Sequence, residues 1–195
     1  MKFLEIKEHL AKFTVGIAGA GGLGSNCAAA LARSGIGTLV ISDFDIIEEA
    51  NLNRQFYFAD QLGMEKTKAI KENIERINSG TNVIINQVEL NPGNIPQIYS
   101  DCDVIVEAFD RADMKVMLIE TVQTKMAGIP LVIGSGMAGW GNNESIKCRK
   151  IDDYLFVCGD ETTEASDESP PMAPRVGIVA NMQANAVIEI LMKKR

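Results

Sequence analysis

The sequence predicts an α/β fold: a mostly parallel β-sheet with helices on both faces and an antiparallel extension near the C-terminus. Three observations support this expectation. Short runs suited to buried strands alternate with helical segments, a glycine-rich turn joins the first run to an Ala-rich helix, and two strand-like runs near the C-terminus are separated only by Asp152 and Asp153. Strand, helix and strand within about 30 residues form the building unit of a parallel sheet.

The first half of the chain contains three expected strands and three expected helices. They are a helix at 3–12, a strand at 14–19 (TVGIAG), a helix at 22–34, a strand at 37–43 (GTLVISD), a helix at 65–78 and a strand at 81–90 (TNVIINQVEL). Gly35 ends the second helix, because glycine readily adopts the left-handed conformation that closes helices. Residues 44–64 have no clean period, and a long irregular stretch inside a compact domain is usually functional.

The second half ends in the antiparallel extension. Residues 145–151 (SIKCRKI) and 154–160 (YLFVCGD) are close enough in the chain to pair as antiparallel strands. Residues 160–174 are acidic and rich in Ser, Thr and Pro, which predicts a mobile loop. The other expected elements are a strand at 103–109 (DVIVEAF), a helix at 112–127 closed by Gly128, a strand at 130–135 (PLVIGS) and a helix at 175–193.

Length and composition fit a single domain over residues 1–195. The net charge of -7 disfavours nucleic acid as a partner, because nucleic acid binds to a basic surface. The apolar runs are too short to span a membrane. The N-terminus carries acids and no small-residue cleavage site follows, so we expect no signal peptide and a cytoplasmic location.

The four cysteines are scattered along the chain, and no two form a Cys-x-x-Cys pair. Zinc sites usually take their ligands in such close pairs, so no zinc site is expected. In a reducing compartment the cysteines should be free thiols. They are Cys27, Cys102, Cys148 and Cys158.

A glycine turn indicates a nucleotide site. Gly19, Gly21 and Gly24 spell G-x-G-x-x-G between a strand and a helix. Such a turn lets the backbone approach a phosphate, and the helix N-terminus attracts the negative charge. Asp43 ends the second strand, where an acid can bind the ribose hydroxyls. We therefore expect a Rossmann-like nucleotide-binding fold, and these features fit NAD as well as ATP.

A second polar group favours ATP. Asn51, Arg54 and Gln55 lie in the irregular stretch, Lys66 begins the next helix, and Asp110 follows the fourth strand, at the edge where open α/β sheets bind ligands. Transfer of an adenylyl group needs cations that offset the charge of the leaving pyrophosphate. Arg and Lys supply such charges, and Asp110 could hold magnesium. The attacking carboxylate is already ionised at about pH 7, so no general base is required.

These residues resemble the ThiF/MoeB family, the sulfur-carrier adenylyltransferases related to the ubiquitin-activating enzymes. The resemblance covers nearly the whole chain in the family's order, and NLNRQ is far more specific than the glycine turn. The matching segments are GAGGLGSN at 19–26, SDFD at 42–45, NLNRQ at 51–55, Gly63 with Lys66, Asp110, the PLVIGS strand and MAPRVGIVANMQAN at 172–185.

The resemblance implies roles for the matching residues. Arg54, Lys66 and Asp110 would be catalytic, with Asp110 serving magnesium. The partner would be a small ubiquitin-like sulfur-carrier protein whose C-terminal glycine carboxylate is activated by ATP, and we expect a homodimer. The implied nucleotide contacts are Gly22 and Asp43 with the nucleotide and Asn51, Arg54 and Lys66 with its phosphates, and the expected site is completed by Gly19, Gly21, Gly24 and Gln55.

Cys158 is a further candidate, as a thiol nucleophile. It stands near the position where family members that form a covalent carrier intermediate have a cysteine. The alternative is a small buried residue at the end of a strand.

The chain differs from the longer family members. It has no paired Cys-x-x-Cys motifs, and the given sequence shows no arginine-bearing N-terminal segment of the kind that completes a neighbour's active site, so we do not expect cross-subunit catalysis. The length and the VCGD…MAPRVGI ending are most similar to the short ThiF-type proteins of thiamin biosynthesis. Activation of a molybdopterin-synthase carrier, as by MoeB, remains open.

Two functions from other classes also remain open. An NAD-dependent oxidoreductase would fit the glycine turn, but it would need a proton donor near the nicotinamide, and the only histidine, His9, precedes the first strand. A non-catalytic scaffold for a ubiquitin-like partner would need no nucleotide. Release of pyrophosphate from ATP in the presence of the carrier distinguishes the three.

Overall fold

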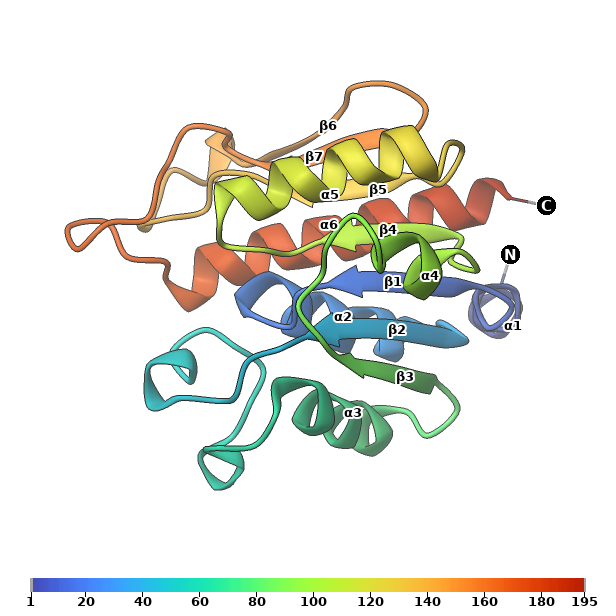
Figure 1. The fold of residues 1–195 in the computed structure, drawn as a ribbon, viewed down its shortest axis with the longest axis horizontal. Helices are drawn as coiled ribbons and strands as arrows, with labels where there is room; N and C mark the ends of the chain where they lie inside the picture. The colour runs from blue at the N-terminus through green and yellow to red at the C-terminus, as the bar shows by residue number, and fades with distance from the viewer. Residues whose placement is uncertain (1, 195) are drawn as a thin grey trace.

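The computed structural model describes residues 2–194. Seven strands form one sheet in the order β3-β2-β1-β4-β5-β7-β6 (Figure 1). Neighbouring strands are parallel except for β6 and β7, which are antiparallel. The predicted fold is therefore confirmed. The strands are β1 (Thr14–Ala18), β2 (Thr38–Asp43), β3 (Asn82–Gln87), β4 (Val104–Glu107), β5 (Leu131–Gly134), β6 (Lys147–Lys150) and β7 (Leu155–Gly159).

Helices cover both faces of the sheet. Helices α2, α3 and α6 pack on one face, and α4 and α5 pack on the other, which is turned to the viewer in Figure 1. The helices are α1 (Phe3–Leu10), α2 (Gly22–Ser34), α3 (Lys66–Ile77), α4 (Ile95–Tyr99), α5 (Ala112–Lys125) and α6 (Ala173–Lys193). Among the described residues, no helix is both long and apolar enough to cross a membrane.

The buried strands supply two cores, one for each face. In β4, Val104 and Val106 belong to the larger core under α2, α3 and α6, while Ile105 belongs to the smaller core under α4 and α5. Successive side chains of a strand point to opposite faces, so a continuous apolar run fills both cores. This is why the buried strands are uniformly apolar in the sequence.

The structure adds short helices that the sequence did not predict. Helix α4 was not predicted, because five residues are too few to show a helical period. The irregular stretch at 44–64 contains two short 3₁₀ helices, Glu49–Asn51 and Ala59–Gln61, and a third lies at Asn143–Ser145. The left-handed Gly35, with φ of 95°, ends α2 as predicted.

The strand order reverses between β1 and β4. The chain moves from β1 to β2 and β3 on one side, and from β4 to β5 and β7 on the other. The carboxyl ends of the parallel strands point to the left in Figure 1, where the long loops gather. A crevice at such a reversal is where open α/β sheets bind ligands.

Candidate active site

A pocket lies at the carboxyl edge of the sheet, where the segments after β1, β2, β4 and β5 meet. Its wall combines residues from both halves of the chain. Gly24, Asn51 and Cys158 do not line it. The predicted site residues that do are Gly19, Gly21, Gly22, Asp43, Arg54, Gln55, Lys66 and Asp110.

The glycines of the turn serve two different purposes. Gly19 has a φ of 97°, a conformation that few other residues adopt. A Cβ atom on Gly24 would lie 1.8 Å from the carbonyl oxygen of Gly19, so Gly24 allows α2 to pack against the turn. Gly21 and Gly22 instead line the pocket at the N-terminus of α2. The first N–H groups of that helix, with the positive end of its dipole, form a site for an anion.

Asp43 is fixed to the turn by two backbone donors. Its carboxylate accepts hydrogen bonds from the N–H of Ala20 at 2.6 Å and of Asp45 at 2.8 Å. Burial raises the pKa of Asp43, while the Ala20 amide and the charge of Lys66 oppose this effect. The carboxylate thus has one orientation at the pocket wall, as a group that accepts ribose hydroxyls requires.

Lys66 brings a buried cation into the pocket. Only 6% of the residue is exposed, and its Nζ donates to Asp45 Oδ2 at 2.7 Å. The hydroxyl of Tyr57 donates to the carbonyl of Ala20 at 2.6 Å and lies 3.4 Å from that of Lys66. Tyr57 therefore links the start of α3 to the glycine turn, and Lys66 lines the same pocket as Gly21 and Gly22.

Arg54 lies over the N-terminus of α2. Its Cγ would be 3.6 Å from a Cβ atom on Gly22, and Asn26 of α2 donates to its backbone carbonyl at 2.9 Å. The guanidinium donates to the carbonyl of Ala50 and to the side chain of Asn53 at 3.2 and 2.8 Å. These loop contacts hold the second cation at the rim of the same anion site.

Two amides of the NLNRQ motif have different positions. The Asn51 side chain accepts from the N–H of Glu48 at 3.0 Å and caps its own 3₁₀ helix, and Asn51 does not line the pocket. Gln55 is buried and lines the pocket, and its Oε1 has no hydrogen-bond partner among the described residues. Of these two residues, Gln55 therefore contributes to the pocket wall and Asn51 does not.

Asp110 lies on a segment that is held on both sides by a buried ion pair. Lys115 Nζ is 2.9 Å from both carboxylate oxygens of Glu107 and from the carbonyl of Gly134. Burial raises the pKa of Glu107, and Lys115 opposes this rise. Lys115 also lines the pocket, and sequence reasoning missed it. The available signal was an acid at the end of an apolar strand with a lysine on the next helix.

Cys158 lies in the core and not in the pocket. It is fully buried in β7, directly opposite the exposed Cys148 of β6. Burial raises the pKa of the Cys158 thiol well above its usual range. A thiolate nucleophile needs the opposite, a lowered pKa and access to substrate. This position supports the alternative interpretation, a small buried residue at the end of a strand.

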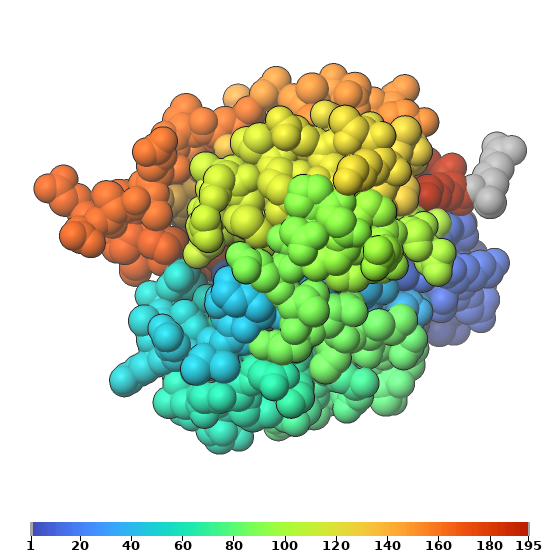
Figure 2. Space-filling view, in the orientation of Figure 1, coloured from blue at the N-terminus to red at the C-terminus, as the bar shows by residue number. Residues whose placement is uncertain are grey.

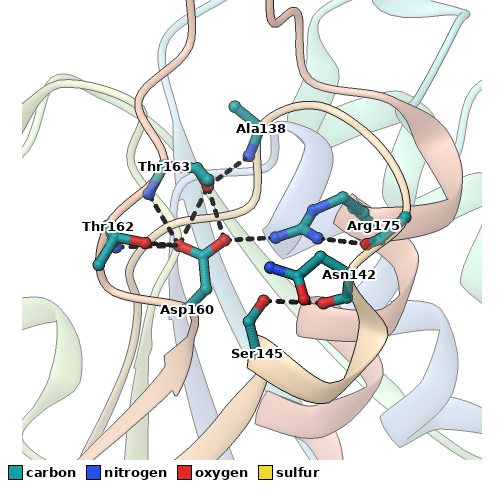
Figure 3. Close-up of polar contacts among 8 residues, drawn as sticks. Ala138, Asn142, Ser145, Asp160, Thr162, Thr163 and Arg175 are labelled. Atoms are coloured by element: carbon teal, nitrogen blue, oxygen red, sulfur yellow. Dashed lines mark hydrogen bonds and ion pairs between the residues drawn. The ribbon is translucent and has the colours of Figure 1, made fainter.

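A second buried ion pair lies outside the pocket lining, and the sequence analysis did not predict it. Asp160 follows β7 and pairs with Arg175 in the first turn of α6 (Figure 3). Their side chains are 2% and 3% exposed. The two residues come from the VCGD and MAPRVGI motifs, but nothing in the sequence indicated that they meet.

Comparison with curated proteins identifies relatives of this chain. The adenylyltransferase and sulfurtransferase MOCS3 of Caenorhabditis briggsae is 30% identical over 194 residues, which cover 96% of this chain and 48% of that protein. The ubiquitin-like modifier-activating enzyme 5 of Arabidopsis thaliana is 44% identical over 78 residues, 40% of this chain and 18% of that protein. The matched part of this chain therefore corresponds to about half of the length of these relatives, or to less than half.

A solved structure has the same fold. The E. coli tRNA N6-threonylcarbamoyladenosine dehydratase TcdA, in complex with ATP, superposes with a TM-score of 0.87 at 21% identity, covering 97% of this chain and 90% of that chain. At this identity the likeness concerns the fold. The ThiF family model matches residues 3–195. This match over nearly the whole chain, with relatives that are adenylyltransferases and modifier-activating enzymes, shows that the protein belongs to the ThiF family.

Proposed function

We propose that the protein is an ATP-dependent adenylyltransferase. It activates the C-terminal glycine carboxylate of a small ubiquitin-like sulfur-carrier protein as an acyl-adenylate and releases pyrophosphate. The observation that carries this proposal is a pocket in which a glycine turn at a helix N-terminus meets the cations Arg54 and Lys66 and the carboxylates Asp43 and Asp110. The relatives support it, since MOCS3 is named an adenylyltransferase and TcdA was solved with ATP.

Each group in the pocket suits one part of ATP. The N–H groups at Gly21 and Gly22 would bind phosphate oxygens, and Asp43 would accept the ribose hydroxyls. Arg54 and Lys66 would offset the negative charge that develops as pyrophosphate leaves, which is where preorganised cations accelerate the reaction most. The attacking carboxylate needs no base, so catalysis rests on position and charge.

Gln55 supports a polar ligand in this pocket. A buried acceptor that lacks a donor costs free energy. The Oε1 atom of Gln55 is such an acceptor among residues 2–194. Rotation of the side-chain amide would bring Oε1 to the pocket, where a hydroxyl or amino group of the nucleotide would donate to it and favour the bound state.

Magnesium fits the pocket through Asp110. Mg²⁺ usually keeps several waters and needs only one or two carboxylates when it is bound with nucleotide phosphates. Asp110 is a carboxylate on the pocket wall, next to the segment held by Glu107 and Lys115. When bound, the ion would neutralise phosphate charge, while Asp110 holds it in place.

The specific partner in this proposal is a ThiS-like carrier of thiamin thiazole biosynthesis. The VCGD…MAPRVGI ending supports this choice. Activation of a molybdopterin-synthase carrier is the alternative, and the similarity to MOCS3 is compatible with either. A homodimer is part of the proposal, and sedimentation equilibrium tests it.

Ligand binding provides the first test. A ligand that binds only the native state raises the melting temperature. We expect ATP with magnesium to raise it and NAD to leave it unchanged. Stabilisation by NAD without stabilisation by ATP would contradict the proposal and favour an oxidoreductase.

Turnover provides the second test. We expect pyrophosphate release from ATP when a ThiS-like carrier is added, and much slower release with a carrier that lacks its last glycine. A molybdopterin-synthase carrier, assayed in parallel, distinguishes the two pathways. Tight binding of a carrier without any pyrophosphate would instead indicate a non-catalytic scaffold.

A further inference from the structure

The buried pair Asp160–Arg175 has no part in the mechanism proposed above. It lies outside the pocket lining, although its residues belong to two of the motifs behind the family resemblance. Burial of two opposite charges adds little net stability, because their desolvation offsets their attraction. The geometry that the pair enforces is therefore a better explanation for it than stability.

Asp160 is held in one position by several donors (Figure 3). The backbone N–H groups of Thr162 and Thr163 donate to its carboxylate at 2.9 and 2.8 Å, and both threonine hydroxyls do so as well. Burial raises the pKa of Asp160, but these hydrogen bonds outweigh burial and leave the pKa below its usual value. The carboxylate is thus a fixed negative charge for Arg175.

Arg175 joins two separate loops. One nitrogen of its guanidinium, Nη2, donates to Asp160 in the loop after β7. The other, Nη1, donates to the carbonyl of Gly141 in the loop after β5, at 2.6 Å. The guanidinium is planar and its donors have a fixed spacing. Both bonds form only if the two loops keep this separation.

The two loops lie side by side, and together we call them the double loop, residues 135–143 and 159–172. The N–H groups of Asp160 and Gly139 donate to the carbonyls of Gly136 and Pro170 at 3.0 and 2.9 Å. A Cβ atom on Gly136 would lie 2.1 Å from Asp160 Oδ1, so no space separates the loops there. In Figure 2 the orange part of the double loop projects beyond the body of the protein.

The double loop forms one wall of the pocket. Gly136, Met137 and Ala138 line it from the first loop, and Ala165 and Pro171 from the second. The groups that would anchor the nucleotide follow β1 and β2, whereas the double loop follows β5 and β7, with β4 between them. The double loop therefore forms the pocket wall that lies across β4 from the groups that would anchor the nucleotide.

We propose that Asp160 and Arg175 are positioning residues for this second substrate. They hold the double loop at the distance at which an extended peptide tail, ending in a carboxylate, reaches the reacting phosphate. On this wall Gly136, Ala138 and Ala165 carry nothing larger than a methyl group. This inference rests on the proposed adenylyltransferase function.

The test uses the double variant Asp160→Asn/Arg175→Gln, which removes both charges and leaves neither one buried alone. We expect the KM for a ThiS-like carrier to rise at least tenfold, with the Kd for ATP with magnesium unchanged within about twofold. Arg149→Gln is the matched control, because Arg149 pairs with Glu161 on the same loop but both are exposed. Its KM should equal that of the wild type. An unchanged KM in the double variant, or an equal loss of ATP affinity, would overturn the proposal.

Two further measurements keep the test decisive. Hydrogen exchange should become faster at residues 136–143 and 161–171 of the double variant and stay unchanged in β1 and β4, whether or not any carrier is activated. Absence of pyrophosphate release by the wild type would thus refute the proposed function, whereas unchanged exchange would refute the positioning role. Arg175→Lys serves if the double variant does not fold. This variant keeps the positive charge but loses the planar pair of donors that joins the two loops, so the KM for the ThiS-like carrier should rise, but less than in the double variant. A wild-type KM in Arg175→Lys would then overturn the proposal.

Discussion

Lys66 and Arg54, the two cations assigned to the phosphates, have different partners in the pocket. The Lys66 side chain is 7% exposed, while its partner Asp45 is 46% exposed. A carboxylate near solvent can turn away at low cost, so a phosphate oxygen could replace it at the buried ammonium. Arg54 is bonded only to neighbouring loop oxygens, which leaves part of its fork available. Both residues can thus bind phosphate without a change in the fold.

Removal of either cation should slow the reaction. We expect Lys66→Ala and Arg54→Ala to reduce kcat for pyrophosphate release by on the order of a hundredfold, because each offsets charge that develops in the transition state. Asp110→Ala should do the same and weaken the dependence on magnesium. Lys68→Ala is the control, since Lys68 lies on the same helix in an exposed pair with Glu65. Near wild-type turnover in a variant would remove that residue from the mechanism.

The cysteines should react in an order set by burial. Cys148 is exposed, whereas Cys27, Cys102 and Cys158 are buried. Burial raises the pKa of Cys27 to about 12. Iodoacetamide at neutral pH, followed by peptide mass spectrometry, should therefore label Cys148 first. Early labelling of Cys158 would support a role as a nucleophile. Wild-type pyrophosphate release and carrier activation by Cys158→Ala would exclude that role.

Among the structural elements, the glycine turn and helix α2 decide where the nucleotide site forms. Gly24 has no role at the pocket surface, yet the turn needs it, because α2 approaches the carbonyl of Gly19 too closely for any side chain. The acidic segment after β7, expected to be mobile, is held at both ends by contacts to the loop after β5. Its mobility remains a prediction.

Substitution of two helical glycines should have opposite effects. Gly24→Ala would bring Cβ to 1.8 Å from a backbone oxygen, so α2 must shift, and we expect a large loss of stability and of ATP binding. Gly177→Ala, in α6, meets no atom within 4 Å. It should stabilise the protein by up to about 1 kcal/mol, since alanine favours helices. Urea unfolding measures both, and equal stabilities would contradict this packing argument.

For the molecule as a whole, the order of the strands brings the pocket-lining residues together at one edge of the sheet. Segments after β1, β2, β4, β5 and β7 reach the same end of the sheet, although β1 and β7 are far apart in the chain. The buried pairs Glu107–Lys115 and Asp160–Arg175 brace that end from two sides. Adenylyl transfer depends on how the reacting groups are oriented, so it needs a pocket whose walls are held in place.

Acid should remove the contribution of Asp160 to global stability. Its pKa in the folded protein is below the value of about 3.9 expected in the unfolded chain. The stabilising contribution is therefore complete above about pH 4 and is lost as the pH falls through the folded pKa. Urea unfolding should show that the free energy of unfolding falls more between pH 6 and pH 3 for the wild type than for the Asp160→Asn/Arg175→Gln variant. A difference independent of pH would mean that Asp160 is not ionised in the folded state.

The sequence by itself determined the strands and all the longer helices along the chain, and most of the site residues that it named line the pocket. Apolar runs, the glycine turn and Gly35 act locally, because the period of a strand or helix and the conformation of a glycine depend on near neighbours. Arg54, Gln55, Lys66 and Asp110 line one pocket at the edge where parallel strands share their carboxyl ends, and their roles there stay predictions.

Only the tertiary structure decided which side chains face the pocket and which are engaged elsewhere. Asn51 caps a 3₁₀ helix, Cys158 is buried against α2 and α6, and Asp160 meets Arg175 across two loops. These outcomes depend on the packing of segments that are distant in the chain, and a short sequence motif contains no information about that packing. Burial then sets the chemistry, since the same thiol or carboxylate has a different pKa in the core and in water.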